Sequence, residues 1–394
     1  MDFYKRDLEK LFVRYKKFPV VAILGPRQSG KTTIAKHHFK NHQYINLEVL
    51  EMREFARADP QKFLRDFENN HGMIIDEFQY VPELLSYIQV QSDEKDRPGY
   101  FVLTGSQNFL MNQAITQSLA GRVGILTLLP LSLHELEKNR LLRSVDQMML
   151  DGAYPRLYKK DLSSLDFYPS YIRTYIERDV RQLTNIGDMA IFEKFLRLCA
   201  GRIGELLNIA EIATQVGVDQ RTIKKWLSVL EASYIIFLLQ PHHKNYNKRL
   251  IKTPKLYFYD TGVACSLLGI QSKEVLSLSP FRGHLFESLI ISDFMKQYAN
   301  LGYRPSLYFW RDMNGRIEVD CIVDNAEKLT PIEIKSGETI QLSFFDSLLN
   351  WNGVSETTSE NNYIVYAGDR AQHRTKGNVV TWKDAATLID DLIK

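Results

Sequence analysis

Residues 20–33 read VVAILGPRQSGKTT, and this stretch decides the fold of the N-terminal part of the chain. It fits the pattern G-x-x-x-x-G-K-[ST], directly after an apolar strand and directly before a helix. In such a loop the glycines let main-chain N–H groups converge on phosphate oxygens. A coincidental glycine-rich turn would not combine strand, loop, Lys-Thr pair and helix. The stretch therefore predicts a nucleotide-binding P-loop.

Two residues of this loop are predicted to act on the phosphates. Lys31 would reach the β- and γ-phosphates, and Thr32 would ligate Mg²⁺. The nucleotide we expect is ATP. The residues predicted to line the nucleotide are Gly25, Pro26, Arg27, Gln28, Ser29, Gly30, Lys31, Thr32 and Thr33, with Asp76 and Ser106 from later strands.

A pair of carboxylates ends a second apolar segment, which reads MIIDE from residue 73 to residue 77. Asp76 takes the place of the aspartate that holds Mg²⁺ beside Thr32 in P-loop enzymes. Glu77 is suited to orient or deprotonate a water that attacks the γ-phosphate. A solvated acidic turn is the alternative, and the buried-looking strand before the pair argues against it. The pair favours hydrolysis over a kinase reaction.

A polar strand end and an arginine are further candidates for sensing the γ-phosphate. A third predicted strand ends in Thr104-Gly-Ser106, which places a hydroxyl where a polar sensor would lie, although Ser106 fits a helix cap equally well. Arg122 is a candidate arginine finger, from this chain or from a neighbour in an oligomer. A structural ion pair is the alternative role for Arg122.

The order of apolar segments predicts an α/β fold. Segments 19–24, 44–47, 72–75, 100–103 and 125–129 alternate with helical patterns, which favours a parallel sheet. Beyond Pro130 the pattern becomes helical, with an amphipathic segment at 168–183, short helices over 195–240 and strand character at 250–260. A helix at 283–298 and strands at 307–311, 317–323, 331–334 and 363–366 predict a second α/β unit. The predicted domains are 1–145, 146–260 and 261–394.

Composition limits the class of protein. The chain has 394 residues, 44% hydrophobic and 25% charged, as in folded globular proteins. Its start lacks an apolar signal core and no apolar run approaches the ~18 residues of a membrane span, so we expect no membrane partner. Three widely spaced cysteines suggest free thiols in a reducing compartment, which makes the cytoplasm the expected location. A net charge of +3 means that any basic surface is local.

Several short motifs carry a resemblance to a known family. They are Leu-Thr-Gly-Ser at 103–106, Leu-Ala-Gly-Arg at 119–122, Gly-Ala-Tyr-Pro at 152–155 and the segment 171–181. With the P-loop and the Asp-Glu pair, they resemble a prokaryotic branch of the AAA+ and STAND-like ATPases almost end to end. The resemblance implies ATP binding and hydrolysis, a helical connector with a winged helix, and a restriction-endonuclease-like α/β domain.

The segment 171–181 leaves two interpretations open. Arg173, Arg178 and Arg181 would close over the nucleotide as sensors in one of them. In the other, which we favour, the helical spacing of these charges makes a salt-bridged surface.

A helix, a glycine turn and a second helix are predicted between residues 207 and 230. Asp219 is a plausible N-cap, and Ile223, Leu227 and Leu230 mark the buried stripe of the second helix. Arg221, Lys224 and Lys225 fall on the opposite face, where a recognition helix would meet double-stranded DNA. The basic stretch 242–255 would form a wing along the DNA backbone. Alternatively, the unit binds a protein partner or packs between domains with its charges solvated.

Carboxylates and a lysine in the C-terminal part follow the order of the PD-(D/E)XK nuclease motif. Glu287 lies on a predicted helix, Asp320 ends one strand segment, and Glu333 and Lys335 share a face of the next strand. The carboxylates would hold Mg²⁺ while Lys335 positions water. Glu333 and Lys335 form a strand-edge ion pair in the alternative, within a domain that only binds DNA or a partner.

Overall fold

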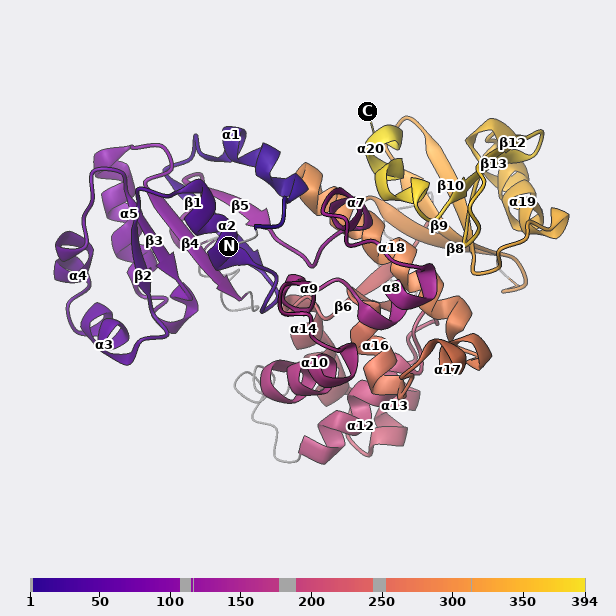
Figure 1. Cartoon of the computed structure of the whole chain (residues 1–394), viewed down its shortest axis with the longest axis horizontal. Helices are drawn as coiled ribbons and strands as arrows, with labels where there is room; N and C mark the ends of the chain where they lie inside the picture. Colours follow the sequence, from indigo (N-terminus) through magenta and orange to yellow (C-terminus); the bar gives the residue numbers. More distant parts are fainter. Residues whose placement is uncertain are drawn as a thin grey trace. The chain divides into compact units, whose positions relative to one another are not determined.

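The computed structural model describes residues 3–106, 115, 117–176, 189–243, 253–312 and 314–393 (Figure 1). Contacts between Cα atoms divide the chain into two compact units. The first contains residues 1–130 with 232–234 and 299–302, and the second contains the remainder. The three-domain division predicted from the sequence stays a prediction.

The first unit is built on a five-stranded sheet of order β2-β3-β4-β1-β5. All four strand pairs are parallel, which confirms the predicted strands and the predicted α/β class. The strands are β1 (Val20–Gly25), β2 (Gln43–Asn46), β3 (Met73–Asp76), β4 (Phe101–Ser106) and β5 (Val123–Thr127). The helices of this unit are α1 (Phe12–Tyr15), α2 (Lys31–His38), α3 (Leu50–Ala58), α4 (Pro60–Asp66) and α5 (Leu84–Lys95).

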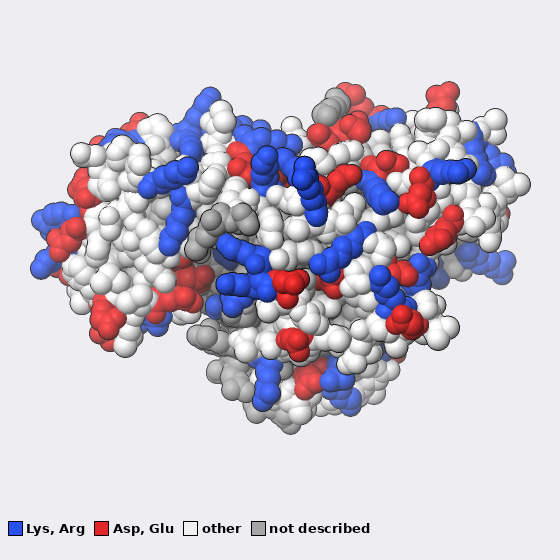
Figure 2. All heavy atoms as spheres, viewed as in Figure 1, with Lys and Arg blue, Asp and Glu red and all other residues white. Residues whose placement is uncertain are grey.

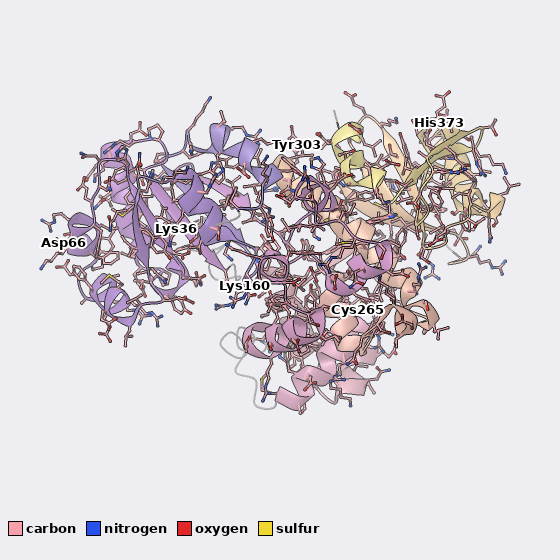
Figure 3. The ribbon with its side chains drawn as sticks, viewed as in Figure 1. Lys36, Asp66, Lys160, Cys265, Tyr303 and His373 are labelled. Atoms are coloured by element: carbon pink, nitrogen blue, oxygen red, sulfur yellow. The ribbon has the colours of Figure 1, made fainter. Side chains whose placement is uncertain are left out.

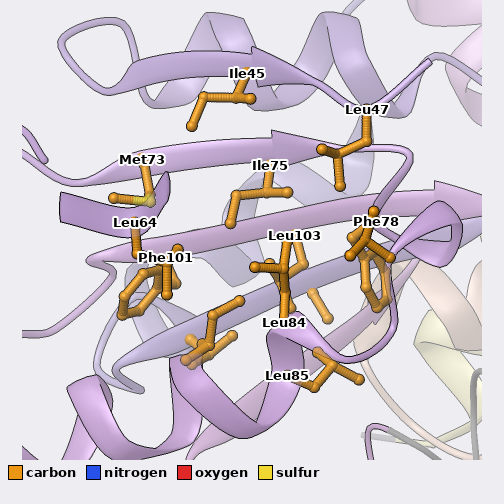
Figure 4. Close-up of a cluster of buried hydrophobic side chains, with 14 of the residues drawn as sticks. Ile45, Leu47, Leu64, Met73, Ile75, Phe78, Leu84, Leu85, Phe101 and Leu103 are labelled. Carbon is orange, nitrogen blue, oxygen red and sulfur yellow. The ribbon is translucent and has the colours of Figure 1, made fainter. Parts of the chain in front are cut away.

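The central strands are buried on both faces, because helices cover a parallel sheet on each side. Successive residues of β1 enter different cores: Val20 and Ala22 join one cluster and Val21 joins another. Figure 4 shows the first cluster, in which side chains from β2, β3 and β4 pack on Leu84 and Leu85 of α5. Packing on both faces fixes the strand register, so the carboxyl ends of β1, β3 and β4 meet at one edge of the sheet.

The second unit contains most of the helices that the structure describes. They are α7 (Leu133–Lys138), α8 (Val145–Asp151), α9 (Pro155–Lys160), α10 (Ser164–Tyr171), α12 (Met189–Ala200), α13 (Ile209–Val216), α14 (Gln220–Ala232), α16 (Thr261–Leu268), α17 (Lys273–Leu278), α18 (Arg282–Leu301), α19 (Asp346–Ser355) and α20 (Leu388–Leu392). A π-helical turn, Ile172–Ile176, follows α10. Arg178 and Arg181 lie outside the described residues.

An eight-stranded mixed sheet completes the second unit, in the order β12-β13-β11-β10-β9-β8-β6-β7. Its strands are β6 (Ile236–Pro241), β7 (Lys255–Phe258), β8 (Leu307–Arg311), β9 (Glu318–Asp324), β10 (Leu329–Lys335), β11 (Tyr363–Tyr366), β12 (Gln372–Arg374) and β13 (Gly377–Thr381). The four predicted C-terminal strands are confirmed. The prediction of helices up to residue 240 is wrong at its end, because a short apolar run without periodicity fits a buried strand as well as a helix.

The described part of the chain contains no helix that combines the length and the apolar character needed to cross a membrane. Cys199, Cys265 and Cys321 are free and buried, and burial raises the pKa of each thiol. Figure 3 marks Cys265, which lies on α16. Basic and acidic side chains are interspersed on the face drawn in Figure 2.

Candidate functional site

The P-loop runs from the end of β1 to the start of α2, as the sequence predicts. Gly25 has φ 151° and a Cβ atom there would lie 2.2 Å from the main-chain oxygen of Leu128. Gly30 has φ 98° and is the N-cap of α2. A side chain is therefore strained at Gly30 and is excluded by contact at Gly25, which explains the two glycines of the motif.

The remaining loop residues are packed to different degrees. Pro26 and Ser29 are buried, Arg27 and Gln28 are half-buried, and Thr33 is exposed. The Ser29 hydroxyl is buried and has no hydrogen-bond partner among the described residues. The N-terminus of α2 adds a partial positive charge at this place.

Lys31 is buried at the first position of α2. Its ammonium donates to the main-chain oxygens of Gly25, at 3.1 Å, and Pro26, at 2.7 Å. These two carbonyl groups are neutral, so they hold the ammonium in place without cancelling its charge. The lysine is thus positioned to attract a phosphate that enters the loop.

Arg6 contacts the P-loop through its side chain, although no sequence motif predicts this contact. Its side chain is buried and donates to the main-chain oxygens of Ser29, at 2.9 Å, and Leu129, at 2.6 Å. These contacts tie the loop to the segment that follows β5. Arg6 is a single arginine far from the motif in sequence, so the sequence contains no pattern that predicts this contact.

Asp76 lies at the end of β3 and accepts hydrogen bonds from three hydroxyl groups. Thr32 donates at 2.9 and 3.0 Å, Tyr44 donates at 2.7 Å, and Thr104 donates from β4. The parallel register explains the meeting, because Asp76 pairs with Asn46 on one side and with Thr104 on the other. The predicted Thr32 and Asp76 pair is therefore in contact. Neither Tyr44 nor the place of Thr104 beside Asp76 was predicted.

Glu77 follows in a left-handed backbone conformation, φ 55°, and is half-buried. Burial raises the pKa of its carboxyl, against the opposing effects of Lys31 and of a hydrogen bond from Gln79. The Gln79 amide donates to Glu77 and, at 3.1 Å, to the hydroxyl of Ser106. Gln79, which was not predicted either, thus connects two predicted site residues.

Arg122 is placed elsewhere. It precedes β5, whose first residue, Val123, pairs with Val20 at the start of β1. Five residue steps of strand, roughly 16 Å, separate Val20 from Gly25, where the P-loop begins. The Arg122 guanidinium forms an ion pair with Asp93 of α5, with a second contact at 2.9 Å. The structure does not bring Arg122 to the P-loop of its own chain.

The predicted helix, glycine turn and helix are present as α13, Gly217 and α14. Gly217 is left-handed, with φ 88°, and Asp219 caps α14 by accepting from the Thr222 N–H at 2.9 Å. The predicted stripe of α14 is buried. Arg221, Lys224 and Lys225 are exposed, as predicted.

The predicted basic wing is corrected at one end. Lys255 is only 3% exposed and belongs to a carboxylate cluster, so it is not a surface residue. It faces inward because β7, on which it lies, is buried along its whole length. Lys244, Lys248, Arg249 and Lys252 lie outside the described residues.

The predicted C-terminal carboxylates are buried in the second unit. Glu287 lies on α18, Asp320 on β9 and Glu333 on β10, and each is at most 8% exposed. The Asp320 carboxylate accepts from the Ile334 N–H at 2.7 Å, and Glu333 accepts from Lys335 at 2.5 Å and from Ser347 at 2.8 Å. Burial first, and then Glu333 and Glu287, raise the pKa of Asp320.

Comparisons with known proteins agree with the first unit. Residues 17–137 match the model of an AAA domain. Residues 142–274 and 282–384 match two domains of unknown function, DUF8612 and DUF4143. The parallel sheet, the P-loop and the AAA match together assign residues 17–137 to an AAA-like P-loop ATPase domain.

The sequence is 30% identical over 329 residues to two mycobacterial proteins. They are Uncharacterized protein Rv2008c of Mycobacterium tuberculosis (strain ATCC 25618 / H37Rv) and Uncharacterized protein Mb2031c of Mycobacterium bovis (strain ATCC BAA-935 / AF2122/97). The alignment covers 82% of this chain and 72% of each relative. The chain belongs to the family of these two proteins.

Solved structures resemble the chain only distantly. The Walker-type ATPase PABY2304 of Pyrococcus abyssi is 17% identical with a TM-score of 0.43, covering 68% of this chain and 96% of that chain. The RuvB Holliday junction branch migration motor of Thermotoga maritima is 17% identical with a TM-score of 0.28, covering 59% and 85%. At these scores the likenesses carry no argument, so the assignment rests on the family matches and the site.

Proposed function

We propose that the chain hydrolyses ATP. The observation that carries the proposal is the meeting of Thr32 and Asp76 beside the P-loop, because a hydroxyl and a carboxylate are oxygen ligands of the kind Mg²⁺ prefers. Bound Mg²⁺ would neutralise phosphate charge. Lys31 would bind the β- and γ-phosphates, with the main-chain N–H groups of residues 27–33 around them.

Glu77 is the proposed general base. Its raised pKa, caused first by burial, moves it toward the range in which a carboxylate accepts a proton from water. Gln79 and Ser106 would keep that water and the γ-phosphate aligned with Glu77. Arg122 stays a candidate finger only toward the nucleotide of a neighbouring chain in an oligomer.

Phosphate release from Mg-ATP tests the proposal on the full chain, for wild type, Lys31→Ala and Glu77→Gln. We expect turnover in wild type and its loss in both variants. Lys40→Ala is the matched control, because Lys40 is exposed and lies beyond the end of α2. Unchanged turnover in Lys31→Ala and Glu77→Gln would contradict the assignment.

We also propose that α13 and α14 form part of a winged helix that contacts double-stranded DNA. Support comes from the three exposed cations of α14, Arg221, Lys224 and Lys225, opposite a buried stripe. Each lysine that no longer neutralises a phosphate should reduce the slope of log affinity against log salt by about 0.9. Lys224→Glu with Lys225→Glu should therefore weaken DNA binding and leave basal ATP hydrolysis unchanged.

The alternative is a nucleotide-dependent switch that binds a protein partner or DNA without cleavage. In it, a PD-(D/E)XK-like fold in the second unit is retained without nuclease activity. ATP turnover that is indifferent to DNA would favour the protein-partner form of this alternative. Stimulation by DNA would favour coupling of the ATPase to nucleic acid.

A further inference from the structure

Lys255 occupies the carboxylate cluster of the second unit, and no motif of the sequence placed it there. The residues of the cluster come from α18, β7, β9 and β10, and all of these residues lie in that unit. Its carboxylates are Glu287, Glu318, Asp320 and Glu333, and its ammonium groups are Lys255 and Lys335. The Lys255 side chain is 4% exposed, against 32% for Lys335.

The Lys255 ammonium bridges two carboxylates. It lies 3.3 Å from Glu287 Oε1 and 2.5 Å from Glu318 Oε1. The Tyr257 hydroxyl also donates to Glu287 Oε1, and His284 Nδ1 lies 3.9 Å from Glu287 Oε2. Glu287 Oε1 therefore accepts from two donors of the chain itself, and Oε2 lies near the His284 ring.

The other carboxylates are engaged in the same way. Asp320 accepts from a main-chain N–H, and Glu333 accepts from Lys335 and Ser347. Among the residues that the structure describes, no three His, Cys, Asp or Glu side chains are arranged to hold a metal ion. These contacts within the chain argue against the Mg²⁺ site expected from the sequence, although every charged position of the motif is filled.

Electrostatics gives the reason. A divalent cation bound by Glu287 would lie within a few ångströms of the Lys255 ammonium. Two like charges a few ångströms apart repel each other strongly where little water screens them. The Lys255 ammonium already supplies positive charge to Glu287 and Glu318, the two carboxylates that it contacts.

We propose that Lys255 takes the place of a metal ion in this cluster, so that the second unit is closed to divalent cations. The closure does not depend on ATP hydrolysis by the first unit. It favours the binding switch over a metal-dependent nuclease. Lys255 is in this sense a positioning residue, which holds Glu287 and Glu318 in place of a metal.

Mn²⁺ binding by the nucleotide-free full chain tests the inference, counted by electron paramagnetic resonance. Wild type and Glu287→Gln should bind equal amounts of Mn²⁺. Lys255→Met should gain one Mn²⁺ site in the second unit. The dissociation constant of this site for Mn²⁺ should be at least about tenfold lower than that of any Mn²⁺ binding in the second unit of wild type. The double variant Lys255→Met with Glu287→Gln should lose the gained site, which separates it from weak binding at the P-loop.

Two controls keep the test decisive. Lys328→Met removes an exposed lysine of the same unit and should change nothing. Mn²⁺ should raise the melting temperature of Lys255→Met more than that of wild type, since only the variant offers a site in the second unit. Cleavage of double-stranded DNA by wild type should be absent with either Mg²⁺ or Mn²⁺.

Two results would overturn the inference. One is Mn²⁺ binding by wild type that Glu287→Gln abolishes. The other is a folded Lys255→Met variant that binds no more Mn²⁺ than Lys328→Met does. If Lys255→Met fails to fold, the comparison of wild type with Glu287→Gln decides alone, with equal binding in support and a loss against.

Discussion

The two units both bury a lysine beside carboxylates, but the lysines have different partners. In the first unit, the Lys31 ammonium donates to main-chain oxygens, and Asp76 accepts from the hydroxyls of Thr32, Tyr44 and Thr104. In the second, the Lys255 ammonium is paired with the carboxylates of Glu287 and Glu318. A charged side chain that is held by neutral groups can still attract a phosphate or a metal ion. Charged side chains that are paired with each other attract these ligands far less.

The largest expected effect is on stability, at Lys255. Lys255→Ala leaves Glu287 and Glu318 without their cation, and removing one partner of a buried pair costs about 3–5 kcal/mol. Lys31→Ala should cost much less, because the main-chain oxygens that accept from Lys31 are neutral. Urea unfolding of both variants measures the difference. Equal losses of stability in Lys255→Ala and Lys31→Ala would contradict the difference in partners described for the two lysines.

The next effect concerns pH. Burial opposes ionisation of Glu287, but Lys255, together with His284 and Tyr257, outweighs burial and lowers the pKa of Glu287 from 4.5 to about 2. Because the folded pKa is depressed, the stabilisation is present above about pH 4.5 and is lost as the pH falls toward 2. Glu287→Gln should cost about 3 kcal/mol of unfolding free energy at pH 7 and progressively less below pH 4.5.

Urea unfolding of wild type and Glu287→Gln from pH 7 to pH 3 measures this change. Glu327→Gln, at an exposed position of the same unit, is the matched control and should show no such pH dependence. A cost of Glu287→Gln that is constant over this range would contradict the ion pair.

The third effect is on catalysis, at Lys31. Lys31→Ala removes the charge that would contact the β- and γ-phosphates, and we expect ATP turnover to fall by about 10²- to 10³-fold. Lys255→Ala should leave turnover within about twofold of wild type if the variant folds, since it belongs to the other unit. Steady-state phosphate release checks both, and a comparable loss in Lys255→Ala would mean that the two sites are coupled.

The smallest effect is at Gln79, which donates to Glu77 and Ser106. Gln79→Ala should lower kcat about tenfold with little change in KM, because it positions the base and does not bind the nucleotide. The hydrogen bond from Gln79 lowers the pKa of Glu77, so its loss should also move the acid limb of the pH–rate profile to higher pH. An unchanged acid limb would assign Gln79 a structural role only.

Much of the first site was predictable because its chemistry is local. The P-loop motif encodes its own backbone conformation, with glycines where Gly25 and Gly30 need them. The strand before Asp76 and Glu77 is recognisable from its apolar residues. The sequence did not predict Tyr44, Gln79 and Arg6 as site residues, because single polar residues carry no sequence pattern. These residues reach the site only through strand register and loop packing.

By itself, the sequence determined the parallel α/β core, the P-loop and the carboxylates beside it, since each follows from short stretches with a fixed period or spacing. Only the tertiary structure decided what Lys255 does. In the sequence it ends a run of basic residues typical of a solvated surface. In the fold, β7 pairs with β6 and buries the Lys255 side chain against Glu287 of α18, which lies 32 residues further along the chain. Whether a charge faces water or a carboxylate depends on such long-range strand pairing, and composition does not reveal it.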